Sequence, residues 1–134
     1  MLDDPTFLYV EDDLASRMVV EMLLPLIGFS KLIILEDSTN FLASVEALHE
    51  KPSVFLLDIQ VKPLDGFAML EILRRHPDYR DTIVIALTAS VMNEQIKLLR
   101  TAGFNSVIGK PIDQRRFPEL LTQILNGEEV WTVT

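Results

Sequence analysis

The sequence of 134 residues contains no cysteine. Disulfide frameworks, thiolate zinc sites, iron–sulfur clusters and cysteine nucleophiles are therefore excluded, and any metal must be held by oxygen or histidine ligands. Basic residues are also few, since 12 lysines and arginines stand against 20 acidic residues and leave a formal charge of -8. This charge disfavours direct binding of nucleic acid, because most of the surface repels an anionic polymer.

Long hydrophobic runs are missing as well. The longest, residues 22–29, is far shorter than the roughly 20 residues that cross a bilayer. The N-terminus carries Asp3 and Asp4 where a signal peptide would carry lysines. We therefore expect a cytoplasmic protein with no membrane partner. With 49% hydrophobic and 24% charged residues, the composition is that of one globular domain.

Two kinds of apolar segment alternate along the chain. Short continuous runs are typical of buried strands, and they predict strands over residues 7–10, 32–35, 54–57, 83–87 and 106–108. Apolar residues at helical spacing lie between and after these runs: Leu14, Met18, Met22 and Leu26; Phe41, Val45 and Leu48; Phe67, Leu70 and Leu73; Val91, Leu98 and Leu99; and Leu120, Leu121, Ile124 and Leu125. We interpret the first of these helical rows as core, because its period matches burial.

Residues at the expected helix ends support these boundaries. Gly28 and Gly103 each follow a helical pattern, where a left-handed residue commonly ends a helix. The expected N-caps of the second and fifth helices are Asp37 or Ser38 and Asp113, respectively.

The order of the elements predicts the fold class. Strands that are apolar throughout must be covered on both faces, and strands separated by one helix are most simply joined by right-handed crossovers. We therefore predict an α/β protein with a doubly wound, five-stranded parallel sheet. The domain is expected to span residues 6–126. Residues 127–134 form a C-terminal tail that is either a frayed end or the stub of a connection to further sequence.

Acidic and polar side chains follow four of the predicted strands. Glu11, Asp12 and Asp13 follow the first strand and Asp58 follows the third. In an open parallel sheet, ligands bind beyond the carboxyl ends of the strands, so we expect these carboxylates to meet. Carboxylates packed together are costly unless a cation neutralises them, and Mg²⁺ prefers oxygen ligands. The sequence therefore predicts a magnesium site in which Glu11 and Asp12 hold the ion and Asp58 shares it.

Two further residues point to phosphoryl transfer. Thr88 ends the fourth predicted strand and Lys110 follows the fifth. An ammonium keeps a neighbouring carboxylate ionised and pairs with phosphate oxygens, and a hydroxyl can donate to the same phosphate. An aspartate can act as the nucleophile in such chemistry and form an aspartyl-phosphate. We predict that Asp58 is this nucleophile and that Thr88 and Lys110 assist it.

Four segments, in this order and spacing, resemble the receiver domain of two-component response regulators. They are residues 9–13 (Tyr-Val-Glu-Asp-Asp), 56–60 (Leu-Leu-Asp-Ile-Gln) with 64–67 (Leu-Asp-Gly-Phe), 86–90 (Ala-Leu-Thr-Ala-Ser) and 109–111 (Gly-Lys-Pro). The resemblance covers about residues 6 to 125. It implies a flavodoxin-like (βα)5 fold with strand order 2-1-3-4-5. It also implies a magnesium-dependent module that takes a phosphoryl group from a histidine kinase or histidine phosphotransfer protein onto an aspartate and then hydrolyses it.

The resemblance also implies roles for single positions. It implies that Glu11 and Asp12 bind the metal, that the backbone carbonyl of Gln60 is a third protein ligand of the metal, and that Asp58 is the phosphoacceptor. Thr88 and Lys110 correspond to the conformational hydroxyl and the lysine of the family, and Pro111 to a proline that follows a cis peptide bond. Two positions depart from the family pattern. Lys62 stands where a proline is common, and Val107 stands where a tyrosine or phenylalanine often turns inward when the domain switches.

Three hypotheses of function remain from the sequence. In the first, phosphorylated Asp58 binds Thr88 and Lys110 and changes the surface of the fourth helix, fifth strand and fifth helix, which an unknown downstream protein recognises. Its only catalysis is self-phosphorylation from a phosphodonor and autodephosphorylation, so it is not a stand-alone metabolic enzyme. The second is an unphosphorylated receiver-like adaptor. The third is an aspartyl-phosphate phosphatase, which would need a second aspartate where this chain has Gln60.

Overall fold

Strands and helices alternate along the chain in the computed structural model, which describes residues 4–90 and 92–131. In chain order the elements are β1 (Phe7–Val10), α1 (Leu14–Ile27), β2 (Leu32–Leu35), α2 (Phe41–Glu46), β3 (Val54–Asp58), α3 (Gly66–Arg75), β4 (Ile83–Thr88), α4 (Asn93–Ala102), β5 (Ser106–Gly109) and α5 (Phe117–Leu125). The five predicted strands are confirmed, and β3, β4 and β5 each extend one residue further than predicted.

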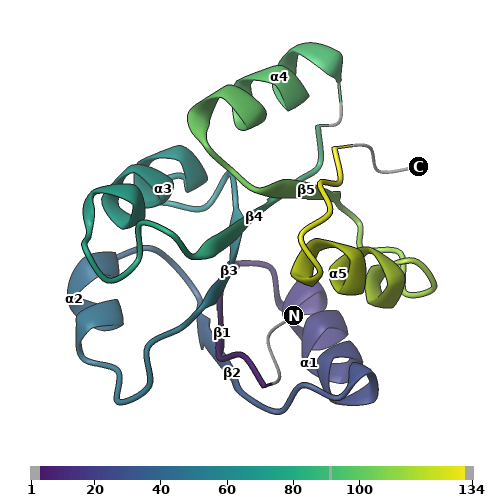
Figure 1. Ribbon diagram of the computed structural model, residues 1–134, viewed down its shortest axis with the longest axis horizontal. Coiled ribbons are helices and arrows are strands. Elements are labelled where there is room, and N and C mark those ends of the chain that lie inside the picture. The colour runs from purple at the N-terminus through teal and green to yellow at the C-terminus, as the bar shows by residue number, and fades with distance from the viewer. Residues whose placement is uncertain (1–3, 91, 132–134) are drawn as a thin grey trace.

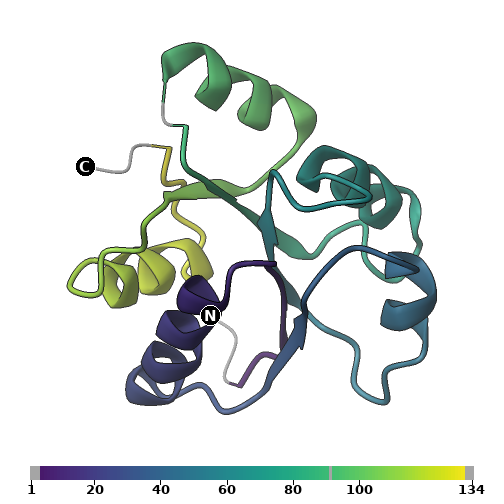
Figure 2. The same cartoon turned by 180° about the vertical axis from the view of Figure 1, so that it is seen from behind.

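The strands form one parallel sheet with the order β2-β1-β3-β4-β5, which confirms the predicted doubly wound fold. Helices α1 and α5 cover one face, and α2, α3 and α4 cover the other (Figures 1 and 2). The winding reverses between β1 and β3, which are neighbours in the sheet although β2 separates them in the sequence. Such a reversal opens a crevice at the carboxyl ends of these two strands.

The core consists of two layers, one on each face of the sheet. Along β1, Phe7 and Tyr9 pack toward α1 and α5, whereas Leu8 and Val10 pack toward α2, α3 and α4. This alternation is the normal period of a strand, and burial on both faces explains why the strands are apolar throughout. Among the described residues, no helix is both long and apolar enough to cross a membrane.

Helix α1 carries two rows of apolar side chains, and only one of them is buried. The buried side consists of Val20, Leu23 and Leu24. The other row, called the α1 row below, consists of Leu14, Met18, Met22 and Leu26. The exposed fractions of these side chains are 61%, 61%, 48% and 77% in that order. The prediction that this row lies in the core is therefore wrong, because period alone does not show which of two apolar rows faces the sheet.

The helix ends agree with the predictions at the glycines but not at the acidic residues. Gly28 and Gly103 adopt left-handed conformations at the C-caps of α1 and α4, as predicted. The N-caps of α2 and α5 are Asn40 and Arg116, so the predicted caps Asp37 or Ser38 and Asp113 are wrong. Asp37 and Asp113 instead accept backbone amides two residues further on, which builds turns that precede the helices. Val91, which the predicted fourth helical row includes, lies outside the described residues.

We expect substitutions on the two sides of α1 to differ in their cost. Leu24→Ala removes a side chain that is 1% exposed, and should lower the free energy of unfolding by about 2–5 kcal/mol. Met18→Ala, at a position that is 61% exposed, should change it by less than about 0.5 kcal/mol. Urea denaturation of both variants measures the difference. Equal losses would mean that the α1 row is buried.

Candidate functional site

The ends of four strands bring together the residues that the sequence singles out. The register pairs Val10 of β1 with Leu57 of β3, so Glu11 and Asp58 follow at the same level of the sheet. Thr88 ends β4 opposite Gly109 of β5, and Lys110 comes directly after. All of these side chains therefore start from the carboxyl edge of the sheet, beside the crevice between β1 and β3.

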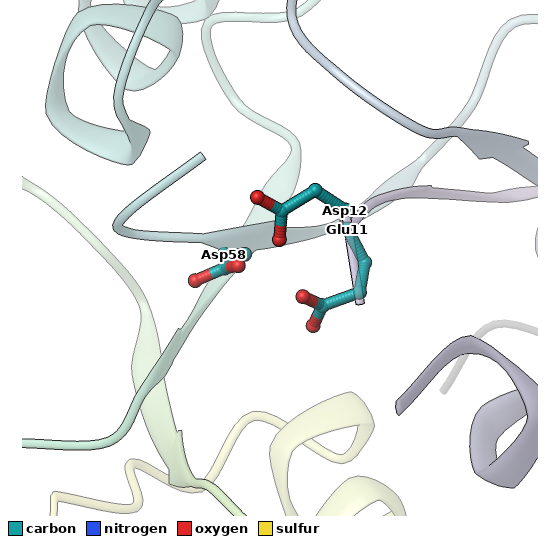
Figure 3. Close-up of side chains that lie close together, drawn as sticks. All are labelled: Glu11, Asp12 and Asp58. Atoms are coloured by element: carbon teal, nitrogen blue, oxygen red, sulfur yellow. The ribbon is translucent and has the colours of Figure 1, made fainter. Parts of the chain in front are cut away.

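Three carboxylates gather at this edge. One oxygen each from Glu11, Asp12 and Asp58 can be chosen so that all lie within 4.8 Å of one another. Figure 3 shows the three side chains around a common space, two from the end of β1 and one from the end of β3. Glu11 is 0% exposed and Asp58 is 5% exposed, whereas Asp12 lies at the surface. Glu11, Asp12 and Asp58 therefore lie together, as the sequence predicted.

Lys110 bridges the two buried carboxylates. Its Nζ atom lies 2.9 Å from Glu11 Oε2 and 3.3 Å from Asp58 Oδ2. The cluster thus contains three carboxylates and one ammonium, so negative charge is in excess there. Oxygen atoms with excess negative charge are the donor set that hard divalent cations prefer. Glu11, Asp12 and Asp58 could therefore hold such an ion.

Two contacts to Glu11 come from residues that the sequence analysis missed. The Tyr9 hydroxyl donates to Glu11 Oε1 at 3.0 Å, and the Arg17 guanidinium donates to the backbone carbonyl of Glu11 at 3.0 Å. Tyr9 was detectable, because residues two apart on a strand point to the same face. Arg17 lies on α1 and also pairs with Glu36 at 3.2 Å, a pairing across the fold that no local pattern indicates.

The electrostatics of the cluster raise the pKa of three of its groups, Glu11, Lys110 and Tyr9. Burial raises the pKa of the Glu11 carboxyl to about 7, the hydrogen bond with Asp58 acts in the same direction, and Lys110 opposes both. Burial lowers the pKa of the Lys110 ammonium, but its bonds with Glu11 and Asp58 outweigh this effect and raise the pKa overall. Burial and the Glu11 carboxylate raise the pKa of the Tyr9 hydroxyl, so that group stays a donor.

Asp13, Gln60 and Thr88 make hydrogen bonds near the cluster but do not belong to the group of three carboxylates. Asp13 caps α1 instead of joining the cluster, since its Oδ2 accepts the Ser16 amide at 2.9 Å. The backbone amide of Gln60 donates to Asp58 Oδ1 at 3.1 Å, which orients the Asp58 carboxylate. The Thr88 hydroxyl accepts the Ser90 amide at 3.1 Å, within the loop that leads toward α4.

The loop after Asp58 is fixed by two close approaches. The hydroxyl of Ser38, which is 0% exposed, donates to the Leu64 carbonyl and accepts the Leu64 amide, both at 2.6 Å. A Cβ atom on Gly66 would lie 2.6 Å from Ile59 Cδ1 and 2.9 Å from Ile59 Cα, so this position requires glycine. The peptide bond before Pro111 is cis, as predicted, and the bond before Pro63 is cis as well.

Comparison with known proteins identifies the family. The family model of the response regulator receiver domain matches residues 7–122. The chain belongs to the response regulator receiver domain family. This finding confirms the resemblance that the sequence motifs indicated.

This receiver is similar to short segments of long histidine kinases and to most of a small response regulator. The chain is 34% identical over 88 residues to the signal transduction histidine-protein kinase BarA of Shigella flexneri, covering 65% of this chain and 10% of the relative. It is 32% identical over 79 residues to the polar-differentiation response regulator DivK of Brucella anthropi, covering 59% of this chain and 64% of DivK. This receiver thus spans about a tenth of the length of the first kinase relatives that it matches.

Solved structures show the same fold. The chemotaxis response regulator CheY4 of Vibrio cholerae superposes with a TM-score of 0.81 at 20% identity, covering 91% of this chain and 99% of CheY4. The receiver domain of the sensor histidine kinase PA1611 from Pseudomonas aeruginosa superposes with a TM-score of 0.77 at 23% identity, covering 92% and 99%. The latter structure has a magnesium ion coordinated in its active-site cleft.

The raised pKa of Glu11 predicts how the stability of the metal-free receiver depends on pH. The ordinary pKa of 4.5 applies to the unfolded chain and about 7 to the folded one, so the folded state binds the proton more tightly. The protonated Glu11 carboxyl therefore stabilises the folded state fully below pH 4.5, and this stabilisation is lost as pH rises through about 7. We therefore expect wild type to lose stability relative to Glu11→Gln between about pH 5 and about pH 8.

Urea denaturation in a chelating buffer at several pH values measures this difference. The glutamine variant is a suitable reference, because it keeps the size of the side chain and removes its ionisation. Free energies of unfolding that run parallel over the whole range would contradict the raised pKa.

Proposed function

We propose that this receiver is the phosphoacceptor of a two-component phosphorelay and that Asp58 takes the phosphoryl group from a histidine kinase or histidine phosphotransfer protein. The observation that carries the proposal is the contact of the buried Asp58 carboxylate with Lys110 at 3.3 Å, beside two further acids. A surface acid would need no such partner. A nucleophile that receives an anionic group needs a fixed carboxylate with positive charge next to it.

We assign the metal to the acid cluster and its identity to Mg²⁺. Glu11, Asp12 and Asp58 would supply carboxylate oxygens, and the backbone carbonyl of Gln60 would be the further protein ligand. Mg²⁺ commonly combines one or two carboxylates with water and phosphate oxygens, which suits a cluster with one exposed member. When bound, the ion supplies neutralisation of the charge on the phosphoryl oxygens.

The transfer step follows from the groups at the site. An oxygen of Asp58 forms a bond to phosphorus, while the phosphorus–nitrogen bond of the donor phosphohistidine breaks. The electron pair of that bond stays on the imidazole nitrogen, and the ring, protonated on its other nitrogen, leaves as neutral histidine. Lys110 then pairs with phosphoryl oxygens in place of the carboxylate that it contacts in the resting protein. Hydrolysis later returns Asp58 and inorganic phosphate.

Thr88 provides the response to phosphorylation in this proposal. Its hydroxyl contacts Ser90 in the resting protein, accepting the amide at 3.1 Å and lying 3.3 Å from the carbonyl. Phosphorylated Asp58 carries a charge of about -2, which offers a stronger acceptor to this hydroxyl. Turning the Thr88 hydroxyl toward it breaks the contacts with Ser90. The loop toward α4 is then free to move, and a downstream partner can distinguish the two states.

The α1 row supports a helical protein as the phosphodonor. The row starts at Leu14, two residues after Asp12, and extends away from the acid cluster for about 18 Å, the length of twelve helical residues. Contiguous exposed apolar side chains mark interaction sites. A donor helix that packs on this row lies next to Asp58, where its phosphohistidine must arrive. Because kinases draw their phosphate from ATP, we place the receiver in the cytoplasm.

Intact mass spectrometry after incubation with acetyl phosphate and magnesium tests the phosphoacceptor. We expect wild type to gain one phosphoryl group and Asp58→Asn to gain none, because the amide is no nucleophile. Asp65→Asn is the matched control, since Asp65 only caps α3 and its variant should be phosphorylated like wild type. Wild type that gains no phosphoryl group from acetyl phosphate or from any phosphohistidine protein, yet still binds its partner, would favour the adaptor hypothesis instead.

Charge in the α1 row should separate donor docking from chemistry. We expect Met18→Asp to slow transfer from a phosphorylated histidine phosphotransfer protein by at least about tenfold, because a charge replaces an apolar contact. The rate with acetyl phosphate should stay unchanged, since that donor needs no protein contact. Leu98→Asp, at a position on α4 that is 58% exposed, serves as the matched control and should leave both rates unchanged. An equal loss with both donors would mean that the substitution damages the site itself.

A further inference from the structure

The segment from Glu128 to Trp131 passes across the outer edge of the sheet at β5. β5 pairs with β4 on one side and has no strand on its other side within the described sheet. There the Val107 amide donates to the Val130 carbonyl at 2.9 Å, and the Val130 amide donates to Ser106 Oγ at 3.0 Å. Figure 1 shows this segment, in yellow, crossing β5 between α4 and α5.

Successive side chains of the segment pack on opposite faces of the sheet, as they do in a strand. Val130 is 9% exposed and joins the core on the side of α1 and α5. Trp131 packs against the core on the side of α2, α3 and α4. The Arg100 guanidinium, on α4, lies 5.4 Å from the centre of the Trp131 ring, within the range of a cation–π contact. The segment is therefore held by the strand edge and by both faces.

An edge strand with free backbone groups is a template for another strand or an extended peptide. In this chain the position beside Val107 is filled by the chain's own backbone. The contacts are few, since they involve three hydrogen bonds of the segment's backbone, one of them from the Glu128 amide to the Gln123 carbonyl of α5, together with one aliphatic side chain and one ring. A tether gives such a segment a local concentration in the millimolar range, so a weak site is filled intramolecularly while remaining open to exchange.

We propose that the outer edge of β5 and the adjoining side of α4 form a peptide-binding surface, and that Glu128–Trp131 is its resident intramolecular occupant. A partner that uses this surface must displace the segment. The chemistry of the surface selects an extended peptide with an aliphatic residue followed by an aromatic one. Its backbone carbonyl accepts the Val107 amide, and its ring lies beside Arg100.

Both anchors of the segment are on elements that reach the acid cluster. β5 leads from Val107 directly to Lys110, and α4 follows the loop after Thr88. The segment therefore contacts the two elements that follow Thr88 and precede Lys110 in the sequence. The proposal itself does not require phosphorylation of Asp58, so it can be tested on the unphosphorylated chain and can fail or succeed independently of the proposed function.

The test uses the full chain with Val130→Ala and Trp131→Ala together, which weakens the intramolecular occupant. The probe is a fluorescein-labelled peptide with the sequence of residues 126–131, and fluorescence anisotropy measures its binding. We expect saturable binding to the double variant and binding at least about tenfold weaker to wild type, whose own segment competes. A peptide with aspartate in place of its valine should not bind.

Two further variants of the double-variant chain locate the bound peptide. Arg100→Ala should weaken binding severalfold, because it removes the cation beside the ring. Leu26→Ala is the control on α1 and should have no effect, since this side chain is 77% exposed and α1 covers the face of the sheet opposite to α4. Absence of binding at millimolar peptide, or equal binding to wild type and the double variant, would overturn the proposal.

Hydrogen exchange of the full wild-type chain provides a second measurement that needs no substitution. A seated segment protects the Val107 and Val130 amides from exchange, because both donate hydrogen bonds across the edge. Exchange of the Val107 amide at the rate of an unstructured chain would overturn the proposal even if the double variant failed to fold.

Discussion

The ion pairs of Lys110 with Glu11 and Asp58, at 2.9 Å and 3.3 Å, join the ends of three strands at a point where burial disfavours charge. Lys110 is separated from Asp58 by 52 residues and from Glu11 by 99. The doubly wound sheet, with β1 and β3 side by side and β5 in the same sheet, places them within hydrogen-bond distance. The site therefore depends on this arrangement of strands, and its excess negative charge suits a divalent cation, which together with Lys110 can neutralise the oxygens of a phosphoryl group.

Several structural details serve to keep this cluster in place. Tyr9 of β1 and Arg17 of α1 donate hydrogen bonds to Glu11, and the backbone amide of Gln60 orients Asp58. Ser38 and Gly66 fix the loop that follows β3. Two further features lie around the cluster: the α1 row is on one face of the sheet, and the segment Glu128–Trp131 covers part of the edge of β5.

Much of this arrangement could be predicted from the sequence, because strand periodicity and the order of the elements determine the sheet, and strand ends determine where side chains meet. Glu11, Asp12, Asp58, Thr88 and Lys110 follow from that rule alone. The α1 row could not be placed, since a helix that is apolar on two sides gives no signal of which side faces the sheet. Arg17 pairs with Glu36 and Ser38 bonds to Leu64, contacts that no local pattern indicates. The packing of Trp131 depends on a strand edge that composition does not reveal.

The central claim is that the carboxylates and Lys110 form one centre that exchanges its internal ion pair for a cation and a phosphoryl group. A crystal structure of the full chain with Mg²⁺ and beryllium trifluoride, a stable mimic of a phosphoryl group, tests this claim most directly. The account predicts that the ion binds among Glu11, Asp12 and Asp58 and that the beryllium of the mimic is bonded to an oxygen of Asp58. It also predicts that Lys110 has turned from the carboxylate to a fluorine atom. A structure in which the ion binds elsewhere, or in which Lys110 keeps its bond to Asp58 while the mimic is bound, would contradict it.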